Sequence, residues 1–388
     1  MKVLVVIDSL GVGGTEASVA EMIPRLVDAG IEATVATLYQ RQPGYEEDLR
    51  RGGHDVRVLR SRSPFGRVRE LRRLVRGLRP DIVHTQLFDS DISGRLAALL
   101  TPAAVFTSLV NTSYEPARRR DPRIRAHRLE AARLVEGWTA RHFTDHFHAV
   151  SRTVKDSAVR HLGIAPERVT VVERGRDPER LGQPGPQRRR RARDQLGVEP
   201  SARLVVSVGR QEFQKGQPYL LDAFEVIAAS RPDVVLVVVG RSGHATSELD
   251  ARRDRSPFRD RICFLGARDD VPELLVAADV FVSSSLYEGM PGAVLEAFAL
   301  AVPVVATDVG ATREVATDGG SALLAPPADV LRLAEAMGRV LDDPALGAAL
   351  GARGREVFAA RFTLDASVRR MIELYERELA SLRRTDHP

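Results

Sequence analysis

The stretch RLVVSVG at residues 203–209 decides the fold, because it repeats in mid-chain the pattern KVLVVID with which residues 2–8 open the chain. Each stretch is a short run of branched apolar residues that leads into a turn, as the first strand of a buried parallel sheet does. Behind both, further Val, Ile and Leu runs alternate with segments of helical period. The sequence therefore predicts an α/β protein with two Rossmann-like, doubly wound domains that face each other across a cleft.

The expected elements follow from these runs. Strands are expected at 3–8, 31–37, 56–59, 81–84, 104–108, 147–150, 169–172, 204–208, 234–239, 262–265, 280–283 and 304–306. Helices are expected at 15–29, 67–78, 92–100, 153–161, 217–229, 271–278, 292–301 and 328–341. A last amphipathic segment, 365–384, predicts a helix that packs back towards the first domain.

A break in composition separates the two halves. Residues 173–201 are rich in Gly and Pro, carry an arginine run at 188–193 and lack apolar periodicity, which is typical of a linker. The sequence thus predicts a first domain at 1–180, a basic linker at 181–202, a second domain at 203–362 and a C-terminal helical segment at 363–388.

Composition limits the function classes. The chain has 388 residues and a formal net charge of +5, and this basic balance suits anionic partners such as nucleotide phosphates or a membrane surface. Its one cysteine, Cys263, excludes an internal disulfide and a cysteine-rich metal site. The opening apolar run is too short for a signal peptide, and no uncharged run approaches the ~20 residues of a transmembrane helix. We therefore expect a cytoplasmic protein, attached at most to the inner face of the membrane.

The segment EGMPGAVLE at residues 288–296 carries most of the functional inference. It follows an expected strand and opens an expected helix, so its first backbone N–H groups lie at the positive end of a helix dipole. Such a helix terminus binds an anionic diphosphate. The amides expected to do so are those of Gly292, Ala293 and Val294.

Two glutamates flank these amides. Glu296 lies four residues after Gly292 on the same helical face, where its carboxylate can accept two ribose hydroxyls. Glu288 lies in the loop before the helix and points a second carboxylate at whatever the diphosphate carries. The plain alternative is a loop-to-helix junction with solvated glutamates.

A second loop follows the first strand of the second domain. Arg210 and Lys215 lie five residues apart there, so two cations can hold the phosphate oxygens that become the leaving group. Lysine is rare in this chain, which otherwise uses arginine for its positive charge. The plain alternative is an exposed turn with two solvated cations.

Together these motifs resemble the family-4 retaining glycosyltransferases, which have the GT-B fold. The resemblance implies that Glu288 contacts hydroxyls of the donor sugar, that Glu296 binds the nucleotide ribose, and that the amides between them hold the phosphates. It also implies that the Gly-Arg…Lys-Gly pair of Arg210 and Lys215 neutralises the donor diphosphate.

The resemblance extends to the base and to the reaction. The turn at Leu265 and Gly266 resembles the family loop that holds the base through backbone contacts. The implied activity is transfer of a sugar from a uridine or guanosine diphosphate sugar to an acceptor hydroxyl with retention of configuration. The attack is on the front face, the departing phosphate takes the acceptor's proton, and neither a metal nor another cofactor takes part.

The first domain matches the family less closely. The loop GVGGTE at residues 11–16 lacks the last glycine of a dinucleotide fingerprint, but it resembles the family loop that approaches the donor. The donor contacts implied there are Gly13, Gly14 and Glu16.

The acceptor side departs further from the family. The family often has His-x-His where this chain has only His84, and Asn-Gly-Val-Asp near residues 173–177. Many members also have a histidine after the strand expected at 104–108, where this chain has none and where Asn111 or a neighbour would replace the contact. The acceptor contacts expected here are His84, Asn111 and Tyr114.

Two other functions stay open. A nucleotide-sugar epimerase or hydrolase of the same architecture would bind the donor and act on it without an acceptor. A non-catalytic nucleotide-sugar-binding scaffold would bind it unchanged. The sequence does not encode the base, the sugar, the acceptor or the oligomeric state, and its scattered histidines provide no third metal ligand.

Basic segments suggest further partners. Residues 67–79 predict a basic amphipathic helix, and the arginines of 118–128 form a second basic cluster. The plain interpretation is a solvated face over a core stripe. The functional one is contact with anionic membrane lipid, above all through 67–79, or with an anionic acceptor. The expected acceptor is a small molecule, a glycan or a lipid-linked sugar, and nucleic acid is not expected because no binding module is recognisable.

Overall fold

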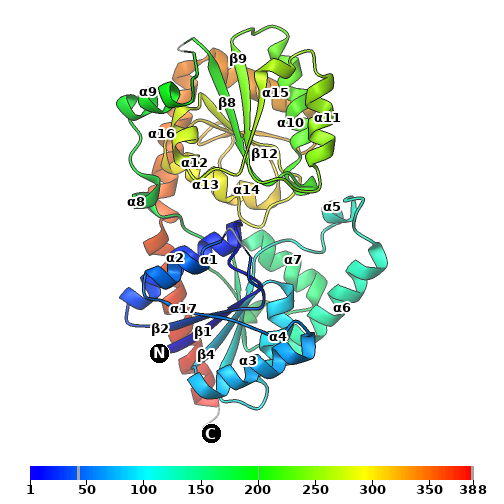
Figure 1. Ribbon diagram of the computed structural model, residues 1–388, viewed down its shortest axis with the longest axis vertical. Coiled ribbons are helices and arrows are strands. Elements are labelled where there is room, and N and C mark those ends of the chain that lie inside the picture. Colours follow the sequence, from blue (N-terminus) through cyan, green and yellow to red (C-terminus); the bar gives the residue numbers. More distant parts are fainter. Residues whose placement is uncertain (42–43, 200, 386–388) are drawn as a thin grey trace. The chain divides into compact units, whose positions relative to one another are not determined.

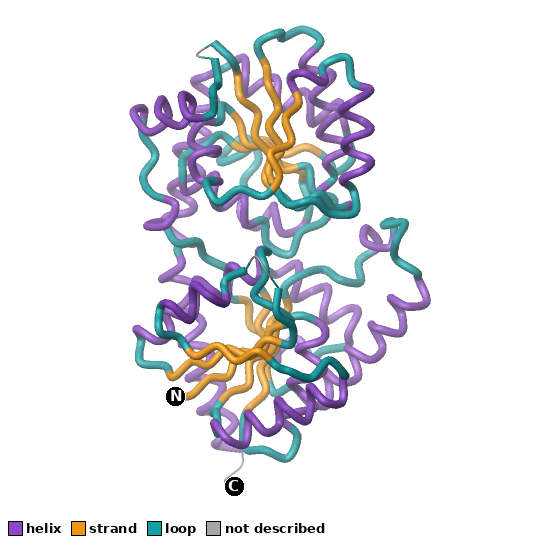
Figure 2. The backbone as a smooth tube through the Cα atoms, in the orientation of Figure 1, coloured by secondary structure: helices purple, strands orange, loops and turns teal. Residues whose placement is uncertain are grey.

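The computed structural model describes residues 1–41, 44–199 and 201–385. The chain forms two compact units, one made of Met1–Arg176 with Leu364–Pro388 and the other of Asp177–Thr363 (Figure 1). In each unit, helices surround a sheet of parallel strands (Figure 2). Residue 200 of the expected linker and residues 386–388 of the expected C-terminal segment lie outside the described residues.

The first unit has a seven-stranded sheet in the order β3-β2-β1-β4-β5-β6-β7. Its elements are β1 (Lys2–Ile7), α1 (Gly14–Asp28), β2 (Glu32–Thr37), α2 (Glu46–Arg51), β3 (Asp55–Val58), α3 (Pro64–Leu78), β4 (Ile82–Gln86), α4 (Phe88–Ala98), β5 (Ala104–Leu109), α5 (Pro116–Arg119), α6 (Ala126–Phe143), β6 (His146–Ala149), α7 (Arg152–Leu162), β7 (Val169–Val171) and α17 (Leu364–Thr385). The strands expected here are confirmed to within one or two residues, whereas α6 was not expected.

Strand β1 shows why the sheet is covered on both faces. Successive side chains of a strand point to opposite faces. Val3 and Val5 pack in one apolar core with α1 and α17, whereas Leu4 and Val6 pack in another with α3 and α4. A continuous run of branched apolar residues is therefore what a doubly covered strand requires.

The C-terminal helix belongs to the first unit, as expected. The main-chain N–H of Leu364 donates to the carbonyl of Arg176 at 2.9 Å as α17 begins. Val368, Met371, Leu374 and Tyr375 then lie buried in the core that α1 shares with β1. The last helix thus closes one face of a sheet whose strands come from the first half of the chain.

A chain of hydrogen bonds crosses this core. Tyr375 contacts Nδ1 of His84, whose Nε2 lies 2.7 Å from Oγ of Ser108; that oxygen lies 2.8 Å from Nδ1 of His148. His148 Nε2 lies 2.8 Å from the carbonyl of Val172 and must donate to it. This bond fixes the donor of each of the other three hydrogen bonds. The Tyr375 hydroxyl donates to His84, His84 donates to Ser108, and Ser108 donates to His148. Burial lowers the pKa of His84 to about 3 and that of His148 to about 4, so both rings are neutral at pH 7.

Replacement of Tyr375 by phenylalanine is expected to destabilise the protein by about 1–3 kcal/mol, because it leaves the buried Nδ1 of His84 without its donor. Chemical denaturation monitored by circular dichroism measures the loss. Tyr219→Phe, in the second unit, is the control. A Tyr375→Phe protein as stable as the wild type would show that the hydroxyl is not needed for this core.

The second unit has a six-stranded parallel sheet in the order β10-β9-β8-β11-β12-β13. Its elements are α8 (Pro178–Leu181), α9 (Pro186–Gln195), β8 (Arg203–Val208), α10 (Gln217–Ala228), β9 (Val234–Val239), α11 (Thr246–Arg255), β10 (Ile262–Gly266), α12 (Val271–Ala277), β11 (Val280–Ser283), α13 (Gly292–Ala299), β12 (Val304–Thr307), α14 (Gly310–Val315), β13 (Leu323–Ala325), α15 (Val330–Asp342) and α16 (Pro344–Arg361). Strands β8 to β12 lie where they were expected, and β13 is additional.

The segment expected as a basic linker contains helix α9, which packs on α12 within the second unit. Its arginines hold it there instead of apolar side chains. Arg188 pairs with Glu273 at 2.6 Å, and Arg189 and Arg193 pair with Asp279 at 2.6 and 3.2 Å. The last two also donate to carbonyls at the C-terminal end of α12, where a helix dipole favours cations. A helix anchored by charge shows no apolar periodicity in the sequence.

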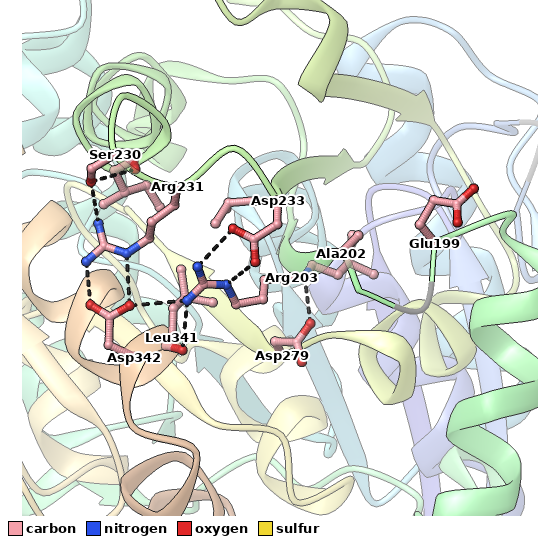
Figure 3. A network of polar contacts seen from close by, with 12 residues as sticks. Glu199, Ala202, Arg203, Ser230, Arg231, Asp233, Asp279, Leu341 and Asp342 are labelled. Carbon is pink, nitrogen blue, oxygen red and sulfur yellow. Dashed lines mark hydrogen bonds and ion pairs between the residues drawn. The ribbon is translucent and has the colours of Figure 1, made fainter.

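A second polar network joins the amino ends of β8 and β9 to the end of α15 (Figure 3). Arg203 pairs with Asp233 at 2.6 Å and with Asp342 at 3.2 Å, and Arg231 pairs with the same Asp342. The ion pairs with Arg231 and Arg203 lower the pKa of Asp342. This network occupies the amino edge of the sheet and leaves the carboxyl edge, where parallel α/β sheets bind ligands, to other residues.

Candidate functional site

The loop after β8 brings a lysine to the carboxyl edge of the second sheet. A single 3₁₀ turn, Phe213–Lys215, precedes Gly216, which has a left-handed backbone with φ of 57°. A Cβ atom at Gly216 would lie 2.1 Å from the carbonyl oxygen of Ser284. Only glycine therefore lets this loop approach the loop after β11 so closely.

Replacing Gly216 by alanine is expected to lower stability by at least about 2 kcal/mol, since the left-handed backbone alone costs an L-residue about 1–2 kcal/mol and the new Cβ would overlap Ser284. Nucleotide binding is expected to weaken with it, because Lys215 is the adjacent residue. Thermal unfolding with and without nucleoside diphosphate measures both effects. Gly77→Ala, in the last turn of α3 with open space around the new Cβ, is the control and should be neutral or stabilising. An unchanged melting temperature for Gly216→Ala would contradict the argument.

Lys215 and Glu288 meet in this region. Lys215 Nζ lies 2.5 Å from Oε1 of Glu288, and the carboxylate is 7% exposed. The Ser285 hydroxyl donates to the same oxygen at 2.7 Å, and the Gln214 amide reaches Oε2 at 3.4 Å. The Glu288 carboxylate is therefore held in place by a cation and two neutral donors.

Gln214 and Ser285 are the residues that sequence reasoning missed. Besides Glu288, the Gln214 amide donates to the carbonyl of Tyr287 at 3.0 Å, and the Leu286 N–H donates to the carbonyl of Gln214 at 2.8 Å. These bonds fix one loop on the other. Neither residue carries a recognisable signal of its own, but Gln214 precedes Lys215 and Ser285 lies three residues before Glu288.

Helix α13 begins at Gly292, as expected, with Pro291 as its N-cap. Among the predicted phosphate-binding amides, Gly292 N–H donates to the carbonyl of Met290 at 2.9 Å and Val294 N–H to that of Pro291 at 3.1 Å. The N–H groups of Gly292 and Val294 therefore already donate to nearby carbonyls. A phosphate bound there would have to compete with these carbonyls or accept from the same N–H groups.

Glu296 lies on α13, 18% exposed in its side chain, with Arg180 of α8 at 3.9 Å from its Oε1. Arg210 lies two residues after the end of β8 and has an exposed side chain. Within residues 1–41, 44–199 and 201–385, Arg210 forms no ion pair. The two predicted cations thus differ, because Lys215 is bound to Glu288 whereas Arg210 faces solvent.

The predicted base-binding turn closes β10. Gly266 has a left-handed φ of 67°, and its carbonyl accepts the N–H of Gly240 at 2.8 Å. The pairing of β10 with β9 shifts register between Phe264 and Gly266, and Leu265, between them, is 36% exposed. The turn therefore presents its backbone and one apolar side chain at the same edge of the sheet as Lys215.

In the first unit, α1 begins at Gly14, where an added Cβ would meet no atom within 4 Å. The Glu16 carboxylate folds back to Gly13, where its nearest oxygen would lie 2.3 Å from an added Cβ. Two arginines border the start of this helix, since Arg174 donates to Thr15 at 3.1 Å and Arg176 reaches Ser18 at 3.2 Å. Burial and the neighbouring Arg176 lower the pKa of Arg174 to about 9. These arginines stand where the family has Asn-Gly-Val-Asp and were not predicted.

The structure changes the predicted acceptor set. His84 is fully buried and bonded to Tyr375 and Ser108, so it cannot contact an acceptor, and the prediction fails because both ring nitrogens serve the core. Tyr114 is 6% exposed and its hydroxyl binds Glu136, which makes it structural as well. Asn111, partly exposed after β5, accepts the N–H of Thr112 at 2.9 Å and stays a prediction.

The structure also bears on metal binding and membrane insertion. Across the described parts of the chain, no cluster of three or more His, Cys, Asp or Glu side chains is arranged to hold a metal ion. Within the same residues, no helix combines the length and the apolar character needed to cross a bilayer.

Comparison with known proteins agrees with this geometry. The family model described as "Glycosyl transferases group 1" matches residues 202–343, and "Glycosyltransferase Family 4" matches residues 12–180. The chain is 32% identical over 367 residues to 2-deoxystreptamine N-acetyl-D-glucosaminyltransferase of Streptomyces fradiae, which covers 86% of this chain and 83% of the relative. It is 31% identical over 316 residues to alpha-maltose-1-phosphate synthase of Mycolicibacterium smegmatis, covering 76% and 79%. A third relative, the lipopolysaccharide core mannosyltransferase LpsB of Rhizobium meliloti, is 34% identical over 213 residues, which span 53% of this chain and 60% of LpsB.

Solved structures share the architecture. Anabaena HepE in complex with UDP-glucose superposes with a TM-score of 0.85 at 22% identity, over 97% of this chain and all of that one. Sucrose-phosphate synthase of Thermosynechococcus elongatus gives 0.83 at 22%, over 98% of this chain. At such identities the likeness shows the fold, which is GT-B. With two family models matching in order and two relatives above 30% identity along most of their length, the chain belongs to the family-4 glycosyltransferases.

Proposed function

We propose that this protein transfers a sugar from a nucleoside diphosphate sugar, with uridine as the base, to an acceptor hydroxyl with retention of configuration. The observation that carries the proposal is the ion pair of Lys215 with the buried carboxylate of Glu288 at the carboxyl edge of the second sheet, next to the first turn of α13. A cation, a fixed carboxylate and a helix N-terminus together suit a diphosphate that carries a sugar.

In the proposed reaction, Lys215 and Arg210 stabilise the charge that develops on the departing diphosphate. Glu288 orients the sugar through its hydroxyls, and Glu296 binds the ribose. The bond between the anomeric carbon and the phosphate oxygen breaks while the acceptor oxygen bonds to the same face of that carbon. The acceptor's proton passes to the departing phosphate. The cations and amides supply the positive charge, so the proposed reaction needs no metal.

Uridine is the proposed base because HepE, which shares the fold, was crystallised with UDP and with UDP-glucose. The turn at Gly266 would hold it through main-chain atoms. The expected contribution of Gly13, Gly14 and Glu16 to the donor site stays a prediction. The acceptor class also stays a prediction, namely a small molecule, a glycan or a lipid-linked sugar.

A binding screen followed by a turnover assay tests the proposal. A ligand that binds only the native state raises the melting temperature, so UDP, GDP and ADP are compared by thermal shift. The nucleotide sugar of the preferred base is then incubated with the protein without acceptor and analysed by mass spectrometry. Slow release of nucleoside diphosphate and free sugar is expected. An epimerised sugar would point to an epimerase, and a bound but unchanged donor to a scaffold.

A further inference from the structure

Helix α6 of the first unit turns polar and small residues inward, and no large apolar side chain is among its buried positions. Its buried positions include Glu136 and Thr139. The Glu136 carboxylate accepts the hydroxyl of Tyr114, and Thr139 Oγ1 lies 3.0 Å from the buried guanidinium of Arg95. Arg133 also reaches across to α7, where it donates to the carbonyl of His161 at 2.7 Å. Figure 1 shows α6 at the side of this unit, next to α7.

The outward side of α6 carries the large apolar residues instead. Leu134 is 58% exposed, Val135 49% and Trp138 50%. Positions three and four apart lie on one face of a helix, so these side chains form a single patch. His142, one turn further on, stacks on the Trp138 ring with 5.0 Å between centroids. An ordinary surface helix has the opposite arrangement, with its apolar stripe against the core.

Positive charge surrounds this patch. Residues 115–143 contain eight arginines and four acidic residues. Three of the acidic side chains form ion pairs, Glu130 with Arg133, Asp121 with Arg123 at 2.6 Å and Glu115 with Arg160 at 3.0 Å. The fourth, Glu136, is buried. Exposed arginines lie before the patch and after it. They include Arg120, Arg125, Arg128, Arg141 and also Arg119, whose guanidinium lies 3.8 Å from Glu130.

Helix α3, where the sequence suggested membrane contact, is built differently. Its apolar residues Leu71 and Val75 are buried in the core beneath the sheet, and Leu74 and Leu78 pack against the same core. Arg67 is buried and donates to the Tyr39 hydroxyl at 2.5 Å. The amphipathic pattern of 67–79 is thus explained by packing within the unit.

We infer that the α6 patch, defined as Leu134, Val135 and Trp138 with the exposed arginines of residues 119–141, docks on an anionic lipid bilayer. Trp prefers the boundary between head groups and acyl chains, and the arginines on both sides of it would bind lipid phosphates. A second copy of the chain fits less well, because a two-fold contact would bring like-charged surfaces together. This inference is independent of which sugar is transferred.

The chain contains a single tryptophan, Trp138, so its fluorescence reports on the patch alone. The full-length protein is mixed with vesicles of phosphatidylcholine containing phosphatidylglycerol, or with phosphatidylcholine alone. With the anionic vesicles we expect the emission to shift to the blue, acrylamide quenching to fall and the protein to co-sediment. Added salt should reverse these changes, because it screens charge attraction. Absence of the shift with anionic vesicles would overturn the inference.

Variants locate the contact. Leu134→Glu keeps the reporter and is expected to reduce the co-sedimenting fraction at least tenfold. Leu331→Glu, at a residue of the second unit that is 70% exposed, is the matched control and should bind like the wild type. Circular dichroism checks that both fold.

Three results would contradict the proposal. Wild-type binding by Leu134→Glu is the first. The second is loss of binding in Arg73→Glu/Arg76→Glu on α3 when Leu134→Glu reduces binding only slightly. The third is an emission already blue-shifted in buffer, together with a dimer that Leu134→Glu dissociates, because the occupant would then be a second copy of the chain.

Discussion

Replacing Glu288 by glutamine is expected to reduce turnover of the nucleotide sugar by two to three orders of magnitude while nucleoside diphosphate binding stays within a few-fold of the wild type. Loss of one fixed polar or charged group from a reacting centre typically lowers turnover by a factor of about 100 to 1,000. Glutamine keeps the size of the side chain and can still accept the Ser285 hydroxyl, but it no longer carries the charge that holds Lys215 at 2.5 Å. The freed cation should favour the diphosphate.

Turnover is followed as release of nucleoside diphosphate, and binding by calorimetry with UDP. Glu335→Gln is the matched control, since Glu335 lies on the surface of α15 with 55% of its side chain exposed. If Glu288→Gln retained at least a third of wild-type turnover, Glu288 would not be the residue that orients the sugar. Equal losses of binding and turnover would assign it to the phosphate site instead.

Replacing Lys215 by alanine is expected to weaken UDP binding about 100-fold, which corresponds to about 2.7 kcal/mol. Two effects act in the same direction. The cation that would contact the diphosphate is lost, and the carboxylate of Glu288, 7% exposed, is left charged without its partner. An unpaired buried charge beside a phosphate site repels the ligand.

The double variant Lys215→Ala/Glu288→Gln separates these effects, because residues in direct contact show non-additive energies. It is expected to bind UDP more tightly than Lys215→Ala alone and less tightly than the wild type. Lys2→Ala is the control, since Lys2 lies in the first unit and pairs with the exposed Glu32 at 3.1 Å. Unchanged UDP affinity in Lys215→Ala would remove the donor site from this loop.

The fold was largely predictable because strands of a buried parallel sheet consist of short, nearly continuous runs of apolar residues. Strand β9 was expected at 234–239 and occurs at Val234–Val239. Helices anchored by polar contacts left no such pattern. Helix α9 is held by arginines that pair with Glu273 and Asp279. Helix α6 exposes its large apolar residues Leu134, Val135 and Trp138. Periodicity rules assume an apolar inner face, so they fail for both.

The candidate site was predictable in part. The Gly-Arg…Lys-Gly loop and residues 288–296 follow strands directly, and parallel topology brings such loops to one edge. The contacts that hold Glu288 were not predictable, because Gln214 and Ser285 have side chains that serve many roles. His84 was assigned wrongly for a related reason. Its partner Tyr375 comes from 291 residues further along the chain, and no local pattern reveals that bond.

Helix α17 also sets the order in which the protein can be completed during translation. The strands of the first unit leave the ribosome first, but Val368, Leu374 and Tyr375, which finish its core, are synthesised after the whole second unit. Until then, one face of the first sheet is covered only in part, by α1, whereas the second unit is continuous and can fold as it emerges. The part of the protein that is made first is the last to be finished.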